Sequence, residues 1–225
     1  MRSVSVPTSK GLFVAITSSL VLMIGAATSC ASIEVGDHVK LYNGVGSPGG
    51  VFHVDDLNDP GVHNLDTFCV EITEYIGFAP AEYVVDFIGT KTNQGGKELG
   101  EFSAWLYTGY LNGSLLTPAE RTVGTKMNAL QVGIWEGMGY TASEISGVIG
   151  SNFDATLLAD FHTAFASSGW SGIGDIRVMS LRTLSGGYAQ DQVFRAAPEP
   201  FSIAVWLLLA VCVGAPLMWK RWHQG

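Results

Sequence analysis

Charged side chains are scarce in this chain, and basic side chains are the scarcest. Charged residues make up 14% of the 225 positions, and 12 basic residues face 20 acidic ones, for a formal net charge of −8. Four of the basic residues lie near the two ends: Arg2, Lys10, Lys220 and Arg221. The middle of the chain lacks the basic surface that displaces counterions from nucleic acid, so we expect no nucleic-acid partner.

Several motifs of common enzymes are also missing. The sequence contains no Gly-x-Ser-x-Gly nucleophile elbow, and no glycine cluster continues into the Lys-Ser or Lys-Thr of a phosphate-binding loop. No two of the five histidines have the spacing of zinc ligands on one helix. We therefore expect no catalytic residues, no metal and no cofactor, and a surface hydrolase is disfavoured.

An acidic segment near position 57 is the closest approach to a cation-binding motif. Four oxygen-bearing side chains precede a Pro-Gly pair there: Asp55, Asp56, Asn58 and Asp59. They lack the spaced ligands and the distal Glu of an EF-hand loop. Asp and Asn side chains before Pro-Gly are typical of turns, so we predict a turn.

The N-terminal segment has the order of a secretory signal. Arg2 and Lys10 precede an uncharged, largely apolar run over 11–32 that ends in small residues. We predict a signal peptide over 1–31, cleaved after Ala31. The alternatives are a lipoprotein whose mature chain begins at a lipidated Cys30, and an uncleaved membrane anchor.

The C-terminal segment combines a proline motif, an apolar run and a basic pair. The motif Pro198-Glu199-Pro200 precedes 19 uncharged residues, 201–219, and Lys220 and Arg221 follow them. At about 1.5 Å per residue the run spans about 28 Å, enough to cross the core of a bilayer. We predict a transmembrane helix over 201–219, with its basic end in the cytoplasm.

This order of elements resembles the PEP-CTERM sorting tail of Gram-negative bacteria, over about the last 30 residues. The resemblance implies that residues 196–225 are recognised and processed by an exosortase, a membrane enzyme of organisms that make exopolysaccharide. Two features depart from the pattern: Pro216 lies inside the apolar run, and the basic cluster is short. The alternative is an ordinary single-pass anchor.

The three cysteines leave one thiol without a partner in the exported part. Cys30 is lost with the predicted signal, and Cys212 lies in the predicted membrane span, so Cys69 is alone. Exported domains normally pair their cysteines. Cys69 is therefore a buried inert thiol, an intermolecular disulfide, a nucleophile, or a residue bonded covalently to another group.

The residues between the two termini predict strands, then helices, then strands. Strands are predicted over 33–42, 51–54, 64–72, 82–88, 176–184 and 190–194, and helices over 98–111, 124–138 and 154–166. This order favours an α+β domain over 32–195, a β-sandwich or barrel with a helical insert.

One residue of the second predicted helix does not fit its surroundings. On a helical wheel with about 100° per residue, Gln131 falls at about 40°, between Met138 at about 20° and Trp135 at about 80°. Glu136 falls on the opposite side. A buried amide without partners costs about 1–3 kcal/mol, so Gln131 must meet a partner, the simplest being a backbone group.

Cys69, on a predicted strand, is the second residue that does not fit its surroundings. Strict alternation puts Phe68 and Val70 on one face and Cys69 on the other, together with Thr67 and Glu71. A cysteine that acts as a small apolar residue would lie among the apolar side chains. Cys69 therefore faces the helical layer, either as a covered free thiol or as a reactive one.

Phe68-Cys69-Val70 and Leu130-Gln131-Val132-Gly133-Ile134-Trp135 resemble the paired motifs of bacterial thioester domains, which are adhesin modules of Gram-positive surface proteins. The resemblance implies an internal thioester between the Cys69 sulfur and the Gln131 side-chain carbonyl, with Phe68 and Trp135 as motif neighbours. Gly133 stands where the family has Ala.

Two functions follow from these patterns. In the first, an exported surface protein attaches covalently to an amine-bearing surface protein or polymer through Cys69 and Gln131, in a single turnover rather than as a cycling enzyme. In the second, an inert structural protein of the exopolysaccharide matrix has the same fold and a buried, reduced Cys69.

Overall fold

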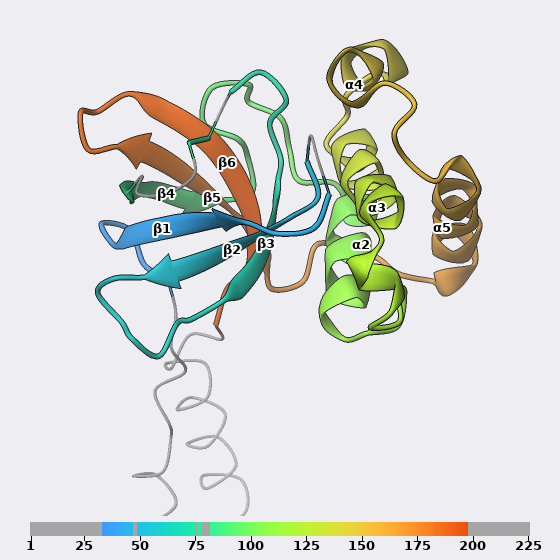
Figure 1. Cartoon of the computed structure of the whole chain (residues 1–225), viewed down its shortest axis with the longest axis horizontal. Helices are drawn as coiled ribbons and strands as arrows, with labels where there is room; N and C mark the ends of the chain where they lie inside the picture. The colour runs from blue at the N-terminus through green and yellow to red at the C-terminus, as the bar shows by residue number, and fades with distance from the viewer. Residues whose placement is uncertain (1–32, 47–48, 75, 78–81, 198–225) are drawn as a thin grey trace, which may run out of the picture. The chain divides into compact units, whose positions relative to one another are not determined.

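Six antiparallel strands form a closed barrel in the computed structural model, which describes residues 33–46, 49–74, 76–77 and 82–197 (Figure 1). The strands are hydrogen-bonded in the order β1-β2-β3-β6-β5-β4, and β4 closes the barrel by pairing with β1. Their bounds are β1 His38–Asn43, β2 Val51–Asp56, β3 Leu65–Cys69, β4 Glu82–Gly89, β5 Ile176–Thr183 and β6 Tyr188–Arg195. Each corresponds to a predicted strand, although several ends differ.

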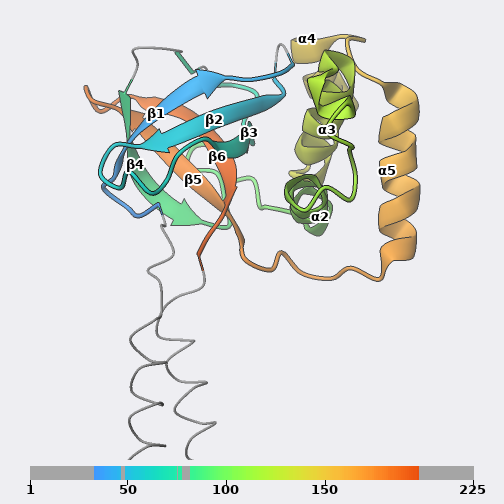
Figure 2. The ribbon, with the colours of Figure 1, turned by 60° about the horizontal axis from the view of Figure 1, so that its bottom comes forward.

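Four α-helices lie between β4 and β5 in the chain. They are α2 Glu101–Leu111, α3 Gly124–Gly137, α4 Ala142–Ile149 and α5 Ala155–Ser168, with a 3-10 helix at η1 Glu120–Thr122. α2 and α3 lie next to the barrel, and α5 packs on their far side (Figures 1 and 2). The predicted α+β class is confirmed, with the barrel as the form of the sheet and the helices as the insert.

α3 is buried through its middle, so its buried face is wider than the predicted apolar arc. Every residue from Met127 to Trp135 is buried. A helix that is apolar almost all round is an inner element rather than a surface one. Glu136 does lie on the outer side as predicted, and its carboxylate contacts Nε2 of His162 on α5 at 2.7 Å.

Two elements differ from the prediction for identifiable reasons. α4 was not predicted, because its serines and glycine are poor helix formers. Thr141 and Glu144 nevertheless form a reciprocal capping box at its N-terminus. β3 ends at Cys69 rather than at position 72. One further ladder bond follows, from the Val70 amide to the Asp191 carbonyl, before Glu71 leaves the sheet.

The apolar core has two parts. Side chains inside the barrel form one cluster, which includes Val39, Leu41, Val85 and Leu181. The larger cluster lies between the barrel and the helices and includes Phe68, Cys69, Leu106, Leu130 and Trp135. The larger cluster packs β3 against α2 and α3.

Both terminal predictions lie outside the described residues. The predicted signal peptide with Cys30, and the predicted tail with its proline motif, Cys212, Lys220 and Arg221, belong to 1–32 and 198–225. Within the described part of the chain, no helix combines the length and the apolar character needed to span a bilayer.

Candidate functional site

Cys69 and Gln131, 62 positions apart in the sequence, meet where the barrel touches the helices. The Gln131 Nε2 donates a hydrogen bond of 2.7 Å to the backbone carbonyl of Cys69. Cys69 ends β3, and Gln131 lies near the middle of α3. Cys69 is 1% exposed and Gln131 is fully buried. The structure thus brings the two predicted residues together.

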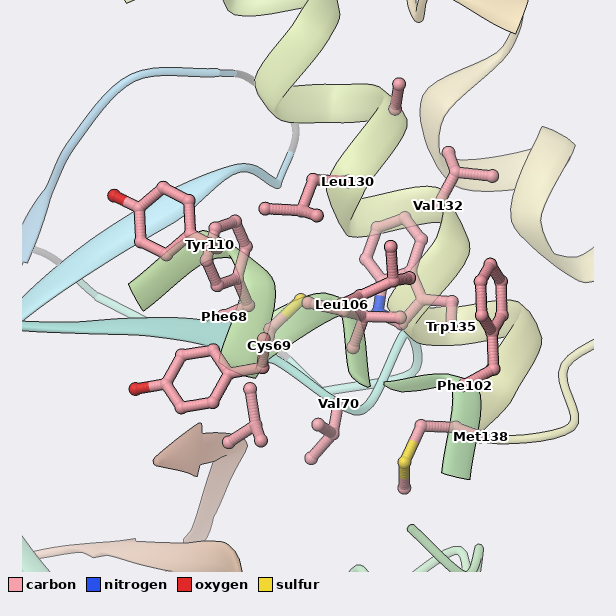
Figure 3. Close-up of a cluster of buried hydrophobic side chains, with 14 of the residues drawn as sticks. Phe68, Cys69, Val70, Phe102, Leu106, Tyr110, Leu130, Val132, Trp135 and Met138 are labelled. Carbon is pink, nitrogen blue, oxygen red and sulfur yellow. The ribbon is translucent and has the colours of Figure 1, made fainter. Parts of the chain in front are cut away.

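An apolar cluster surrounds this contact. Figure 3 shows Cys69 between Phe68 and Val70 on the strand, with Leu106 and Trp135 beside it on the helices. The expectation that Cys69 lies apart from Phe68 and Val70 is wrong, because the helices cover this end of β3 and all three side chains share one cluster. The expectation that Cys69 faces the helical layer is confirmed.

The backbone of Gly49, at the end of the β1–β2 loop, covers Gln131. A Cβ at Gly49 would lie 2.9 Å from Cγ of Gln131 and 3.4 Å from the Trp135 ring. The φ of Gly49 is +103°, a conformation that side chains other than glycine rarely adopt. The close approach excludes water on this side of Gln131, a condition that an activated acyl group needs.

The surroundings of Cys69 keep its thiol protonated. Burial raises the pKa of the thiol far above its ordinary value; the nearby Trp135 indole opposes this shift, and the Glu71 carboxylate adds to it. Because the thiolate is the nucleophilic form, Cys69 in this state is protected from dissolved electrophiles. A reaction at Cys69 therefore needs a partner already in contact with it.

One buried polar atom at this contact, Oε1 of Gln131, has no hydrogen-bond partner among the described residues. Leaving a buried polar atom unsatisfied costs about 1–3 kcal/mol. The Gln131 amide thus has the backbone partner that the sequence predicts through Nε2, whereas its Oε1 has none.

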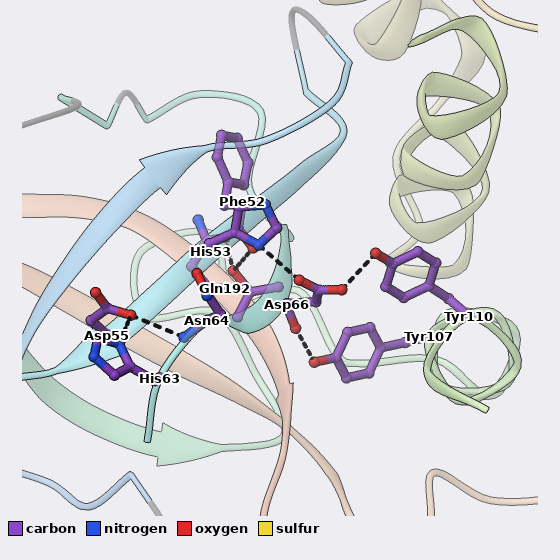
Figure 4. Close-up of polar contacts among 10 residues, drawn as sticks. Phe52, His53, Asp55, His63, Asn64, Asp66, Tyr107, Tyr110 and Gln192 are labelled. Atoms are coloured by element: carbon purple, nitrogen blue, oxygen red, sulfur yellow. Dashed lines mark hydrogen bonds and ion pairs between the residues drawn. The ribbon is translucent and has the colours of Figure 1, made fainter. Parts of the chain in front are cut away.

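A polar network joins β3 to α2 beside the apolar cluster (Figure 4). Asp66 contacts Nδ1 of His53 at 2.8 Å and accepts a 2.7 Å hydrogen bond from the Tyr110 hydroxyl, while the Tyr107 hydroxyl donates to its backbone carbonyl. These bonds hold β3 against α2 and so position Cys69. These hydrogen bonds were not predicted, because the two tyrosines follow an apolar helical pattern in the sequence.

Three acidic side chains also meet near the site: Glu71, Glu74 and Asp191. Each offers an oxygen within 4.8 Å of the others. Glu71 and Asp191 are buried, and Glu74 is half-buried. Burial and the neighbouring Glu71 carboxyl raise the pKa of Glu74 to about 8 and that of Asp191 to about 7. Nothing in the sequence signals this cluster, since Asp191 comes from β6.

The acidic segment near position 57 forms the predicted turn only after Asp56, because Asp55 and Asp56 extend strand β2 and pair with Lys40 and Val39 of β1. The Asp55 carboxylate accepts from the Asn64 amide and contacts His63, as Figure 4 shows. Asp56 accepts from the amide of Asn58, and Asp59 accepts from the amide of Gly61. The amide oxygen of Asn58 accepts from the backbone of His38. Each of these four side chains accepts a hydrogen bond from a backbone amide.

Comparisons of the chain with family models, curated proteins and solved structures gave no significant match.

Proposed function

We propose that this chain is an exported surface protein whose domain over 32–195 forms an internal thioester between Cys69 and Gln131 and through it attaches covalently to an amine-bearing target. The observation that carries the proposal is the contact of the Gln131 amide with residue Cys69, across 62 positions of sequence. Both residues are sealed in an apolar cluster that covers them on the strand side and on the helix side.

The chemistry uses only these two side chains. The Cys69 sulfur attacks Cδ of Gln131, an S–C bond forms, the C–N bond breaks, and the thiol proton leaves with the nitrogen as ammonia. The former amide oxygen becomes the thioester carbonyl oxygen. A thioester carbonyl is a weaker hydrogen-bond acceptor than an amide carbonyl, so the lack of a partner for Oε1 costs less after the reaction.

An inert matrix protein is the competing function. In that case the hydrogen bond from Gln131 to the Cys69 carbonyl is the whole purpose of the amide, and Cys69 is a small buried residue. Two observations favour the thioester: the amide oxygen is left unsatisfied, and the glycine backbone of Gly49 closes over the side chain.

The mass of the intact exported protein tests thioester formation. We expect the wild-type protein to weigh one ammonia less than its processed sequence, because ammonia is the only group lost. Cys69→Ala and Gln131→Glu should each have their full sequence mass, since the first lacks the sulfur and the second has no amide to lose. Gln94→Glu is a matched control, because Gln94 is exposed, and its variant should keep the deficit.

Wild-type protein of full sequence mass, with Cys69 alkylated quantitatively after denaturation, would contradict the thioester. The deficit must also be absent from the same protein after unfolding in hydroxylamine, which cleaves thioesters. A deficit that persisted under those conditions would belong to another modification.

Export and sorting of the chain are proposed from its two ends. The apolar run over 11–32 supports secretion, and the proline motif with the apolar run over 201–219 and its basic pair supports recognition by an exosortase. In a host that has an exosortase, we expect the domain outside the cytoplasm and the tail processed. Deletion of 198–225 should abolish processing and surface retention. Unchanged sorting of the deleted protein would show that the tail carries no signal.

A further inference from the structure

The indole N–H of Trp135 is a buried hydrogen-bond donor that meets sulfur rather than oxygen. Trp135 is 1% exposed and belongs to the apolar cluster that encloses Cys69. Its Nε1 makes no hydrogen bond to an oxygen or nitrogen atom among the described residues. A buried N–H without any acceptor costs about 1–3 kcal/mol, so the neighbouring sulfur matters.

The acceptor is the Cys69 side chain. Figure 3 shows the Trp135 indole nitrogen turned toward the Cys69 sulfur. Burial raises the pKa of the Cys69 thiol, and the hydrogen bond from the Trp135 side chain opposes that rise. A neutral thiol is a weak acceptor, whereas hydrogen bonds to a charged acceptor are about twice as strong. The Trp135 N–H therefore favours negative charge on this sulfur.

Helical spacing puts Trp135 and Gln131 on one face of α3. Residues four positions apart are neighbours on a helix surface. The Gln131 Nε2 donates to the Cys69 carbonyl at 2.7 Å, and the Trp135 N–H donates to the Cys69 sulfur. Both side chains pack under the backbone of Gly49, whose Cβ position lies 2.9 Å from Cγ of Gln131 and 3.4 Å from the Trp135 ring. One helix face thus binds both polar groups of Cys69.

We propose that the Trp135 indole N–H stabilises negative charge on the Cys69 sulfur when the thioester forms and when an amine cleaves it. This role rests on the proposed thioester. During formation the sulfur gives up its proton as it attacks Cδ of Gln131, and that proton leaves with ammonia. During cleavage the electron pair of the C–S bond goes to the sulfur, which then takes a proton from the amine nitrogen. The indole keeps its own proton throughout.

The surroundings make this donor important. A preorganised donor acts more strongly in a site that excludes water, because no solvent competes for the developing charge. The nearby Glu71 carboxylate disfavours a charged sulfur. A phenylalanine ring would fill much of the same space without offsetting that effect, so the N–H is the part of Trp135 that the chemistry needs.

An isosteric replacement of Trp135 tests the role. Benzothienylalanine keeps the shape of tryptophan but has sulfur in place of the indole N–H. In the full chain, purified in mild detergent, we expect methylamine uptake per thioester-bearing molecule to be at least about tenfold slower than in the wild type. The ammonia deficit should also develop more slowly. The melting temperature should stay within about 2 °C of the wild-type value, because volume and apolar contacts are kept.

Two further replacements separate the N–H from the ring. Benzothienylalanine in place of Trp105, whose ring packs against Phe102 and Phe165, is the matched control and should leave the uptake rate unchanged. Fluorotryptophan at position 135 retains the N–H and makes it a stronger donor, so this protein should react at least as fast as the wild type. A ring that served packing alone would not produce this order of rates.

Two results would overturn the role of Trp135 while leaving the thioester in place. One is a benzothienylalanine protein with the full ammonia deficit and the wild-type uptake rate. The other is equal slowing by the replacement of Trp105, which would assign the effect to loosened packing. Wild-type protein of full sequence mass would instead contradict the thioester, and the role of Trp135 with it, so the two failures are distinguishable.

Discussion

Methylamine added to the exported protein should become attached once per chain, at Gln131, with the release of one thiol at Cys69. The amine nitrogen attacks Cδ of Gln131, a C–N bond forms, the C–S bond breaks, and a proton returns to the sulfur. The product is an N-methyl amide in place of the original amide, so the ammonia deficit disappears. Peptide mapping by mass spectrometry would locate the label, and alkylation would count the thiol.

The reaction should stop after one turnover. Neither product group is activated, and the pKa of the released Cys69 thiol is again raised by burial, so nothing regenerates the thioester in the presence of excess amine. We therefore expect a burst of one equivalent followed by no further uptake. Continued uptake beyond one equivalent would show a cycling transferase and would contradict single-turnover attachment.

Two variants separate this chemistry from adventitious labelling. Cys69→Ala and Gln131→Glu should both take up no methylamine while they keep the wild-type fold, checked by circular dichroism. Gln94→Glu should react as the wild type does, because its side chain is exposed. Equal labelling of the wild type and the three variants would show that methylamine reacts at a site other than Gln131. The inert matrix protein would then be the favoured function.

The two proposed thioester residues were visible in the sequence because each one broke a local pattern. Gln131 stands out on a helical wheel as a polar group among apolar ones, and Cys69 stands out as the single cysteine of the predicted domain. Their meeting was not visible in the pattern alone. It depends on the packing of β3 against α3, which joins residues 62 positions apart.

The pairing of distant strands explains what the sequence could not predict. Alternation located the strands, but a barrel also needs pairs between strands distant in the sequence, as His38 of β1 pairs with Val84 of β4 and Phe68 of β3 with Val193 of β6. The acidic cluster depends on the same kind of contact, since β6 brings Asp191 to Glu71. The burial of α3 through its middle likewise depends on the outer helix α5, which amphipathic periodicity does not reveal.

Phe68→Ala should destabilise the domain by about 4 kcal/mol, the range for removing a buried aromatic ring. The Phe68 ring is fully buried and packs edge-on against the rings of Tyr110, at 5.1 Å between centroids, and Tyr107, at 6.2 Å. Together with the hydrogen bonds of Asp66, it joins β3 to α2 next to Cys69. For a domain of this length we expect the melting temperature to fall by about 10 °C.

Phe87→Ala is the matched control, because it removes the same ring from a strand where the side chain is 48% exposed. Its free energy of unfolding should change by no more than about 0.5 kcal/mol. Urea unfolding of the wild type and both variants would measure the difference. If Phe68→Ala cost no more than Phe87→Ala, the barrel and the helices would not share a packed core at β3, and the contact of Gln131 with Cys69 would lose its structural support.

If Phe68→Ala folds with the expected loss, its ammonia deficit should be smaller than that of the wild type, because loosened packing admits water to the thioester.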